Sequence, residues 1–256
     1  PPSRFGPGFG ADAHAAAPRA AGDERPLAIG VHVPFCPSLC LHCTADPAVA
    51  APWARIDAYL GRLARELALQ AELFGHRPAV EDLHLGGGTP ALLGPARLER
   101  LHEHVRRAYP LRADGGGDYS VRIDPRTADA ATIGAFARLG FNRATVGVTD
   151  LNAAVQRAVN RPLPMAAVRR AVAACRAAGF GLVELELTHG LPYQTENSVA
   201  RTADRLVALE PDRVLLERHV HRPDRFPPQR HLGSAALPDA GMRRAIVERV
   251  AGRLDA

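Results

Sequence analysis

Short apolar runs alternate with longer amphipathic stretches from residue 27 to the end of the chain. Runs rich in apolar and β-branched residues predict six strands: Leu27–Val33, Val80–Leu85, Tyr119–Ile123, Ala144–Val148, Gly181–Leu187 and Arg213–Glu217. After each run, apolar residues recur every three or four positions, as they do on one face of a helix. The six apolar faces comprise Ile56, Leu60, Leu63, Leu67 and Phe74; Leu98, Leu101 and Val105; Ile133, Phe136 and Leu139; Val168, Val172 and Cys175; Val199, Ala203 and Leu206; and Met242, Ile246 and Val250.

Six strand–helix units in a row predict an all-parallel sheet with helices outside it, either as an open doubly wound sheet or as an incomplete barrel. Residues 1–26 are rich in Ala, Pro and Gly and show no periodicity. We therefore expect a loose N-terminal arm, followed by one α/β domain over residues 27–256. In either architecture, ligands bind at the carboxyl ends of the strands, so the residues that follow each strand are the candidates for a functional site.

Composition argues against two classes of partner. The chain has 256 residues and a formal net charge of +5, but its 32 basic residues are all Arg and are interleaved with 27 acidic residues. Aromatic residues make up 5% of the chain, so no stacking platform for nucleic acid is expected. No apolar run approaches the roughly 18 residues of a membrane helix, and the N-terminus has no signal-peptide pattern. We expect a cytoplasmic protein without nucleic-acid or membrane partners and, since the chain does not begin with Met, a fragment or a processed product.

Three of the four cysteines lie within eight residues, directly after the first predicted strand. Cys36, Cys40 and Cys43 form a C-x3-C-x2-C motif, and four cysteines are too few for a disulfide scaffold. Three thiolates on a short loop can hold three corners of a cubane iron–sulfur cluster. The alternative is a zinc ion, which needs a fourth ligand such as His32, His42 or a more distant histidine.

The other strand ends also carry candidate chemistry. The second strand runs into Gly86-Gly87-Gly88-Thr89-Pro90, where glycines let a backbone approach a ligand closely, although the spacing is not that of a dinucleotide fingerprint or a P-loop. Three glycines alone would indicate a tight turn, but their place one unit after the cysteine loop favours a binding role. Polar residues follow the remaining strands: Asp124 and Arg126, Thr149 and Asp150, Glu186 and His189, and Glu217, His219 and His221. Each alone would be a turn former, a cap or a rim residue, but together they indicate a polar ligand at one mouth.

These segments together resemble the radical S-adenosylmethionine (SAM) superfamily and, within it, the oxygen-independent coproporphyrinogen III oxidases. The matching segments are Val31–Cys36, Leu83–Pro90, Ile123–Arg126, Gly140–Arg143, Val155–Arg161, Gly190–Thr195, Pro211–Arg213 and His221. The resemblance implies an α/β fold, a partial (β/α)6 TIM-like barrel of parallel strands with outer helices. It also implies that a [4Fe-4S] cluster and SAM generate a radical that removes a hydrogen from a propionate side chain, so that loss of CO2 leaves a vinyl group during haem biosynthesis.

The functional residues of the family match particular positions in this chain. By this resemblance, Cys36, Cys40 and Cys43 are the cluster ligands. The implied SAM contacts are Gly87, Gly88 and Thr89 for the amino group, His42 through its backbone, Arg161, and Glu186. No catalytic residue is assigned. The implied partners are a tetrapyrrole substrate and an electron donor, and we expect a monomer.

Four positions depart from the family pattern. The family has Tyr at the position of Gly30, Glu at Arg122, Gln at Thr149 and Asp at Glu186. Each lost charged or bidentate contact would weaken binding by roughly 1.5–3 kcal/mol. Because about 1.4 kcal/mol is a tenfold change, several such losses would lower SAM affinity by orders of magnitude. Family members also continue into a smaller C-terminal domain, so we expect this chain to be the core without that domain.

Three hypotheses for the function follow. The first is the decarboxylating oxidase. The second is a related radical SAM methyltransferase or other tailoring enzyme, which the altered cofactor contacts motivate. The third is a haem chaperone or a cluster-binding pseudoenzyme. The chaperone group has Asp-Phe after the third cysteine, whereas Thr44-Ala45 follows it here, which argues against that group.

Overall fold

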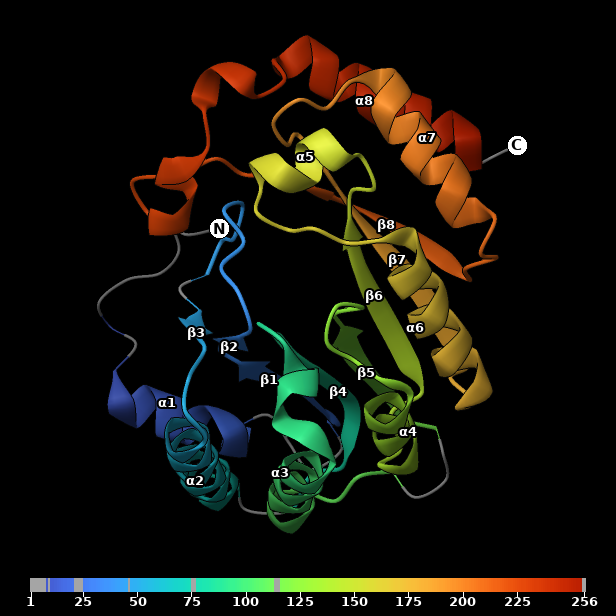
Figure 1. The fold of residues 1–256 in the computed structure, drawn as a ribbon. Coiled ribbons are helices and arrows are strands. Elements are labelled where there is room, and N and C mark those ends of the chain that lie inside the picture. The colour runs from blue at the N-terminus through green and yellow to red at the C-terminus, as the bar shows by residue number, and fades with distance from the viewer. Residues whose placement is uncertain are drawn as a thin grey trace.

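The chain alternates strands and helices along most of its length (Figure 1). The computed structural model describes residue 8 and residues 10–20, 25–45, 47–74, 77–112 and 116–254. Its strands are β1 Leu27–Val33, β2 Phe35–Cys36, β3 Ala48–Val49, β4 Val80–Gly87, β5 Asp118–Ile123, β6 Arg143–Thr149, β7 Leu182–His189 and β8 Arg213–Arg218. Its α-helices are α1 Ala11–Ala20, α2 Trp53–Glu72, α3 Gly94–Ala108, α4 Ala130–Arg138, α5 Ala153–Ala158, α6 Met165–Ala177, α7 Glu196–Val207 and α8 Ala240–Leu254. Short 3-10 helices are η2 Pro90–Leu93, η3 Pro227–His231 and η4 Ser234–Ala236.

Six parallel strands form one sheet in the order β1-β4-β5-β6-β7-β8. Helices α2, α3, α4, α6, α7 and α8 lie along the outer side of this curved sheet, whereas α5 lies near the carboxyl end of β6 (Figure 1). In the described part of the chain, β1 and β8 form the two edges and do not pair, so the sheet is an open, partial barrel. This confirms the predicted α/β class with a parallel sheet. Between consecutive strands of the sheet, the chain returns through a helix to the end at which the strands begin.

Side chains alternate between the two faces of the sheet, as the strand periodicity of two requires. On β7, Val183, Leu185 and Leu187 are fully buried and belong to the hydrophobic core beneath the helices. Their neighbours Glu186 and Thr188 face the other way and line a cavity on the concave side. The alternation of apolar and acidic residues in this strand therefore separates a packed outer face from a polar inner one.

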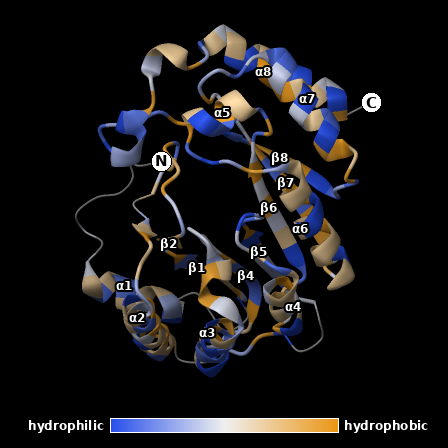
Figure 2. Cartoon of the chain, viewed as in Figure 1, coloured by the Kyte–Doolittle hydropathy of each residue, from blue (hydrophilic) through white to orange (hydrophobic). Residues whose placement is uncertain are grey.

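The outer helices bury their apolar stripes against the sheet. Figure 2 shows hydrophobic and hydrophilic residues interspersed along these helices, and the buried ones include Leu60, Phe136 and Val168. Cys175 lies fully buried in this core, as its position on an apolar stripe predicted, and burial raises the pKa of its thiol to about 12. At neutral pH Cys175 is therefore a protonated thiol, which is not a nucleophile or a metal ligand.

Three elements differ from the sequence expectation. Residues 1–26 were expected to be a loose arm, but Ala11–Ala20 form helix α1; the rest of the arm lies largely outside the described residues. The pairing of β2 with β3 and the short helix α5 were not predicted, because each is too short to show a period.

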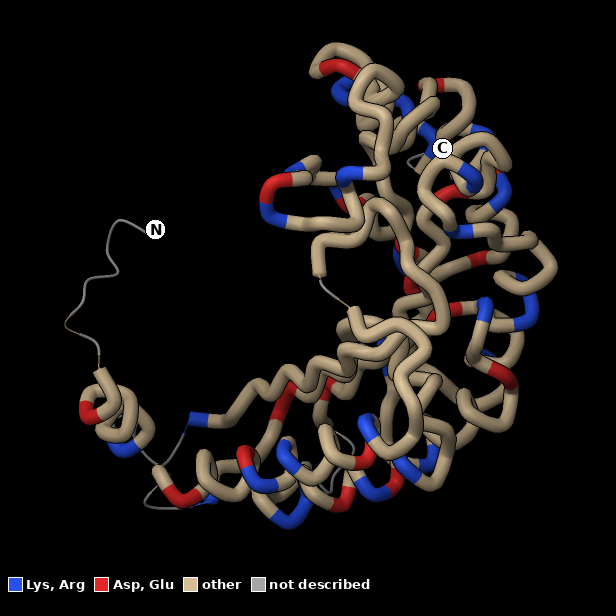
Figure 3. The backbone as a smooth tube through the Cα atoms, turned by 60° about the vertical axis from the view of Figure 1, so that its left-hand side comes forward, with Lys and Arg blue, Asp and Glu red and all other residues tan. Residues whose placement is uncertain are grey.

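Two features bear on possible partners. Acidic and basic residues are interspersed along the chain (Figure 3), so its charge is not concentrated in one segment. Among the helices that the structure describes, none has the length and apolar character needed to cross a bilayer.

Candidate functional site

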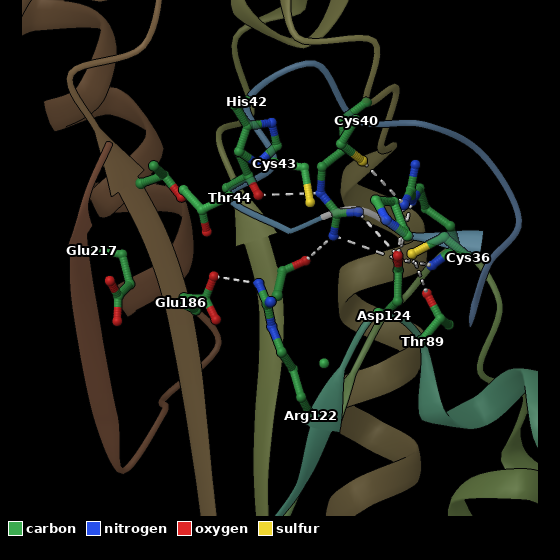
Figure 4. A pocket seen from close by; sticks show the side chains of 18 of the residues that line it. Cys36, Cys40, His42, Cys43, Thr44, Thr89, Arg122, Asp124, Glu186 and Glu217 are labelled. Atoms are coloured by element: carbon green, nitrogen blue, oxygen red, sulfur yellow. Dashed lines mark hydrogen bonds and ion pairs between the residues drawn. The ribbon is translucent and has the colours of Figure 1, made fainter. Parts of the chain in front are cut away.

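A cavity of about 350 Å³ lies at the carboxyl ends of the parallel strands (Figure 4). Its walls come from the loop after β1 and from the ends of β4, β5, β6, β7 and β8. All of the positions predicted to hold a cluster or SAM line this cavity: Cys36, Cys40, His42, Cys43, Gly87, Gly88, Thr89, Arg161 and Glu186. Of the four divergent positions, Arg122, Thr149 and Glu186 also line it. The structure thus brings these residues to one place, while their roles remain predictions.

The three cysteines of the loop each have a hydrogen-bond donor near the sulfur. Thr89 Oγ1 lies 3.8 Å from Cys36 Sγ, Arg126 Nη2 lies 3.7 Å from Cys40 Sγ, and the backbone N–H of Ala45 donates to Cys43 Sγ at 3.4 Å. Burial raises the pKa of Cys36, and the bond from Thr89 opposes that rise. A donor at each sulfur can hydrogen-bond to a thiolate, the form in which cysteine binds a metal.

The zinc alternative requires several ligands around one ion. Within the described residues, no three His, Cys, Asp or Glu side chains are arranged to hold a single metal ion. A cubane cluster makes a different demand, since each thiolate binds its own iron. Three cysteines that line one cavity, with no fourth ligand placed beside them among the described residues, fit a cluster better than they fit zinc.

The glycines after β4 permit a close approach between β4 and the start of the cysteine loop. A Cβ atom at Gly88 would lie 2.5 Å from the backbone oxygen of Phe35 and 2.8 Å from Cys36 Sγ, so only glycine fits. The N–H groups of Gly88 and Thr89 donate to the carbonyls of Val33 and Phe35 at 2.7 and 2.8 Å. These glycines thus fix where the cysteine loop begins relative to the sheet.

Asp124, at the end of β5, is held between two arginines. Arg126 Nη2 lies 2.7 Å and Arg161 Nη1 2.9 Å from Asp124 Oδ2. Burial alone would raise the pKa of Asp124, but the hydrogen bond and charge of Arg126, with the charge of Arg161, lower it well below its usual range. Arg126 also donates to Ser38 Oγ at 3.3 Å, so the pair couples β5 to the cysteine loop. Sequence reasoning gave Arg126 no such role, because its partners on the loop lie more than 80 residues away.

Arg161 is almost fully engaged within the protein. Its guanidinium donates to Thr149 Oγ1 at 3.1 Å, to the Gly147 carbonyl at 2.6 Å, and twice to Asp124. An arginine has five N–H groups, so these four bonds leave one for a ligand. Thr149 adopts a φ of +70°, a left-handed conformation that is unfavourable for a β-branched residue.

Arg122 and Glu186 form an ion pair on the inner face of the sheet (Figure 4). Burial raises the pKa of Glu186, Arg122 opposes the rise, and Glu217 on the neighbouring strand adds to it. A Cβ atom at Gly147 would lie 3.4 Å from Arg122 Nη2 and 3.5 Å from Arg161 Nη2. The missing side chain at Gly147 thus leaves room for both guanidinium groups over β6.

His42, within the cysteine loop, and His219, directly after β8, lie near one another as neutral rings. Burial, with the positive charge of Arg161, lowers the pKa of His42 to about 3, and burial lowers the pKa of His219 to about 4. Their rings meet edge to face with centroids 6.5 Å apart. Neither His42 Nδ1 nor His219 Nε2 has a hydrogen-bond partner in the described part of the chain. Neutral rings with such nitrogens suit contact with a polar ligand.

Comparison with known proteins shows the family of this chain. A model of the radical SAM superfamily matches residues 31–206. The chain is 40% identical over 232 residues to an oxygen-independent coproporphyrinogen III oxidase of Pseudomonas aeruginosa, covering 91% of this chain and 50% of that protein. It is 36% identical over 225 residues to the protein of the same name from Escherichia coli, covering 88% and 49%. The chain therefore spans about half the length of the curated relatives it matches.

Solved structures give the same picture. The structure of coproporphyrinogen III oxidase (HemN) from Escherichia coli, described as a radical SAM enzyme, matches with a TM-score of 0.91 at 33% identity, covering 99% of this chain and 57% of that one. The radical SAM methyltransferase TsrM from Kitasatospora setae matches with a TM-score of 0.52 at 18% identity, covering 76% and 37%. The second likeness shows a shared fold alone.

Proposed function

The chain belongs to the radical SAM superfamily, and on that premise we propose that it is the catalytic core of an oxygen-independent coproporphyrinogen III oxidase. The observation that carries the proposal is three cysteine thiols from one loop around a cavity at the carboxyl ends of parallel strands. The 40% identity to the Pseudomonas aeruginosa oxidase supports the choice of substrate. Because the chain spans about half of that relative, the complete reaction and its tetrapyrrole substrate are part of the proposal.

Cys36, Cys40 and Cys43 would hold a [4Fe-4S] cluster, and three thiolates would leave one iron for SAM. When bound, the cluster and SAM would supply the radical that removes a hydrogen from a propionate side chain, whose loss of CO2 leaves a vinyl group. We assign residues 27–256 to this core and propose a cytoplasmic setting with a separate electron donor, since thiols that hold a cluster need a reducing compartment.

The protein's own part is to position these groups and to limit water in the cavity. Arg126 holds the cysteine loop against β5 through Ser38 and Cys40. We assign Gly87, Gly88, Thr89 and the His42 backbone to the SAM side of the cavity. These residues lie beside the cysteines.

Two further residues, Arg161 and Glu186, would contact SAM with side chains that already have partners within the protein. Arg161 has one N–H group left beyond its bonds within the protein, so it would mainly orient Asp124 and Thr149. Glu186 is already paired with Arg122, so a ligand would meet a neutralised carboxylate rather than an isolated one. Both restrictions favour weaker SAM binding than a site with these groups unpaired.

A second candidate is a radical SAM protein that binds the cluster but performs another reaction or none. The Arg122–Glu186 ion pair favours it, because the pair occupies two positions where the family carries two acidic residues. This candidate shares the cluster and differs in whether SAM is cleaved and what the radical attacks.

Anaerobic reconstitution followed by a two-step assay tests the proposal. With dithionite and SAM, the reconstituted protein should release 5′-deoxyadenosine. When coproporphyrinogen III is added, vinyl products should form in proportion to the 5′-deoxyadenosine released. Cleavage of SAM without vinyl products would overturn the oxidase in favour of another radical SAM enzyme. A loaded cluster with no cleavage of SAM would favour a cluster-binding protein without this activity.

A further inference from the structure

Gln229 joins the cysteine loop to the segment that follows β8. It lies in η3, in the segment that follows β8, between two Pro residues and two basic ones. Its exposed fraction is 0%, the lowest among the buried polar residues of the described chain. A fully buried amide in a surface segment needs partners for all of its polar atoms.

The hydrogen-bond partners of Gln229 come from the cysteine loop and from the segment after β8. Its Nε2 donates to the carbonyl of His42 at 3.4 Å, to that of Cys43 at 3.3 Å and to that of Val220 at 3.1 Å. Its Oε1 accepts from the backbone N–H of Arg222 at 2.6 Å. Two N–H groups shared among three carbonyls fix the orientation of the amide, since the reverse orientation would set oxygen against oxygen.

Other hydrogen bonds hold the first half of the cysteine loop, among them those of Arg126 to Ser38 and Cys40. The loop residues that the structure describes between β2 and β3, 37–45 and 47, form no regular helix or strand. The first half of the loop is also held by the end of α5, where the N–H of Leu41 donates to the carbonyl of Val159 at 2.9 Å and Asn160 donates to that of Leu39 at 2.8 Å. Gln229 contacts the second half, at His42 and Cys43.

We propose that Gln229 is a positioning residue that holds the Cys43 end of the loop, so that the third thiol stays in register with the other two. The inference rests on the proposed function, because it concerns the loop that would carry the cluster. It adds a residue 186 positions from Cys43 to that machinery. It also assigns a role to the segment after β8, which contacts the cysteine loop through Gln229.

A matched control is available in Gln194. It is also buried, with an exposed fraction of 4%, and its amide bonds to Asp150 Oδ2, to the carbonyl of Thr188 and to the N–H of Leu191 at 2.7, 2.8 and 2.9 Å. None of these partners belongs to the cysteine loop. Replacing either glutamine with Met keeps a similar volume and removes the hydrogen bonds, so Q229M and Q194M lose comparable numbers of bonds at different places.

The first experiment uses the cluster-free protein, so that its result does not depend on the proposed function. Hydrogen–deuterium exchange should be about tenfold faster in residues 37–45 of Q229M than in wild type, and unchanged there in Q194M. Equal exchange of this loop in Q229M and wild type would overturn the proposal. Faster exchange in both variants would also overturn it, because the effect would then be general loosening.

The second experiment measures how long the loaded cluster survives. After anaerobic reconstitution, a chelator should bleach the visible absorbance of Q229M about tenfold faster than that of wild type or Q194M. If Q229M does not fold, Q229E replaces it, since it keeps the acceptor for Arg222 and loses the donors to the loop. Equal bleaching rates in a folded Gln229 variant and wild type would contradict the proposal. Failure of wild type itself to bind a cluster would contradict the proposed function while leaving the exchange result to decide on Gln229.

Discussion

Arg122 on β5 and Glu186 on β7 form an ion pair across β6, with Arg122 Nη2 2.5 Å from Glu186 Oε1. By the resemblance of the sequence to its family, we expected two separate departures at these positions, one of which reverses a charge. In the folded chain the two side chains pair with one another. The cation at position 122 neutralises a carboxylate that burial would otherwise protonate more readily.

We expect R122Q to destabilise the protein by about 1–2 kcal/mol, below the range for a fully buried pair because the Arg122 side chain is 37% exposed. Chemical denaturation of R122Q, E186Q and the double variant measures the coupling. The double variant should be less destabilised than the sum of the two single variants. Additive losses would show that the pair contributes no coupling energy.

Removing the charge of Asp124 should cost more, because it leaves two partly buried arginines without their carboxylate. We expect D124N to lose about 3 kcal/mol of unfolding free energy at neutral pH. R143Q, which breaks the more exposed pair between Arg143 and Asp118, should lose less than about 1 kcal/mol. Similar losses in D124N and R143Q would contradict the central place of Asp124.

The same carboxylate predicts a pH dependence. The pKa of Asp124 is lower in the folded protein than in the unfolded chain, so its contribution is present above the unfolded value of about 3.9. It is lost as the pH falls below that value toward the folded pKa. The difference in unfolding free energy between wild type and D124N should therefore shrink between about pH 5 and pH 3. A constant difference over this range would contradict the assignment.

The close approach of β4 to the cysteine loop predicts a contrast between two glycines. G88A should destabilise the protein by about 2–4 kcal/mol and impair cluster binding, because the new methyl group would meet backbone and sulfur atoms. G30A should leave stability unchanged or raise it by up to about 1 kcal/mol, since nothing lies within 4 Å of a Cβ atom there. Thermal unfolding and iron content of both variants check this. Equal behaviour would show that the close approach is not a constraint.

The backbone at Thr149 offers a further test. Its φ of +70° suits Asn better than a β-branched residue, and Asn retains a side-chain oxygen that can accept from Arg161. We expect T149N to stabilise the protein by about 1 kcal/mol in denaturant unfolding. A loss of stability would show that the Thr149–Arg161 bond outweighs the relief of strain.

Local patterns predicted much of this molecule. The six strands and their helices follow from period and turn signals, and the rule that ligands bind at the carboxyl ends of strands identified residues that line one cavity. The period of two also places Glu186 and Thr188 on the inner face of β7.

Long-range pairings could not be predicted in the same way. The bonds of Arg122 to Glu186 and of Gln229 to Cys43 join residues 64 and 186 positions apart, and nothing in the neighbouring residues signals them. Helix α1 was missed because its Ala-rich stretch contains Pro18 and lacks an apolar stripe. Position on a strand end can be inferred from sequence, whereas the partner of a polar side chain depends on the assembled fold.

The iron and sulfide content of the anaerobically reconstituted protein, measured for wild type and for each cysteine variant, decides whether the three loop cysteines hold a cluster. We expect about four iron and four sulfide per wild-type chain. We expect loss of this content in C36A, C40A and C43A, and its retention in C175A, since Cys175 lies in the core. One zinc per chain, or full iron content after loss of any of the three loop cysteines, would show that they do not hold a [4Fe-4S] cluster.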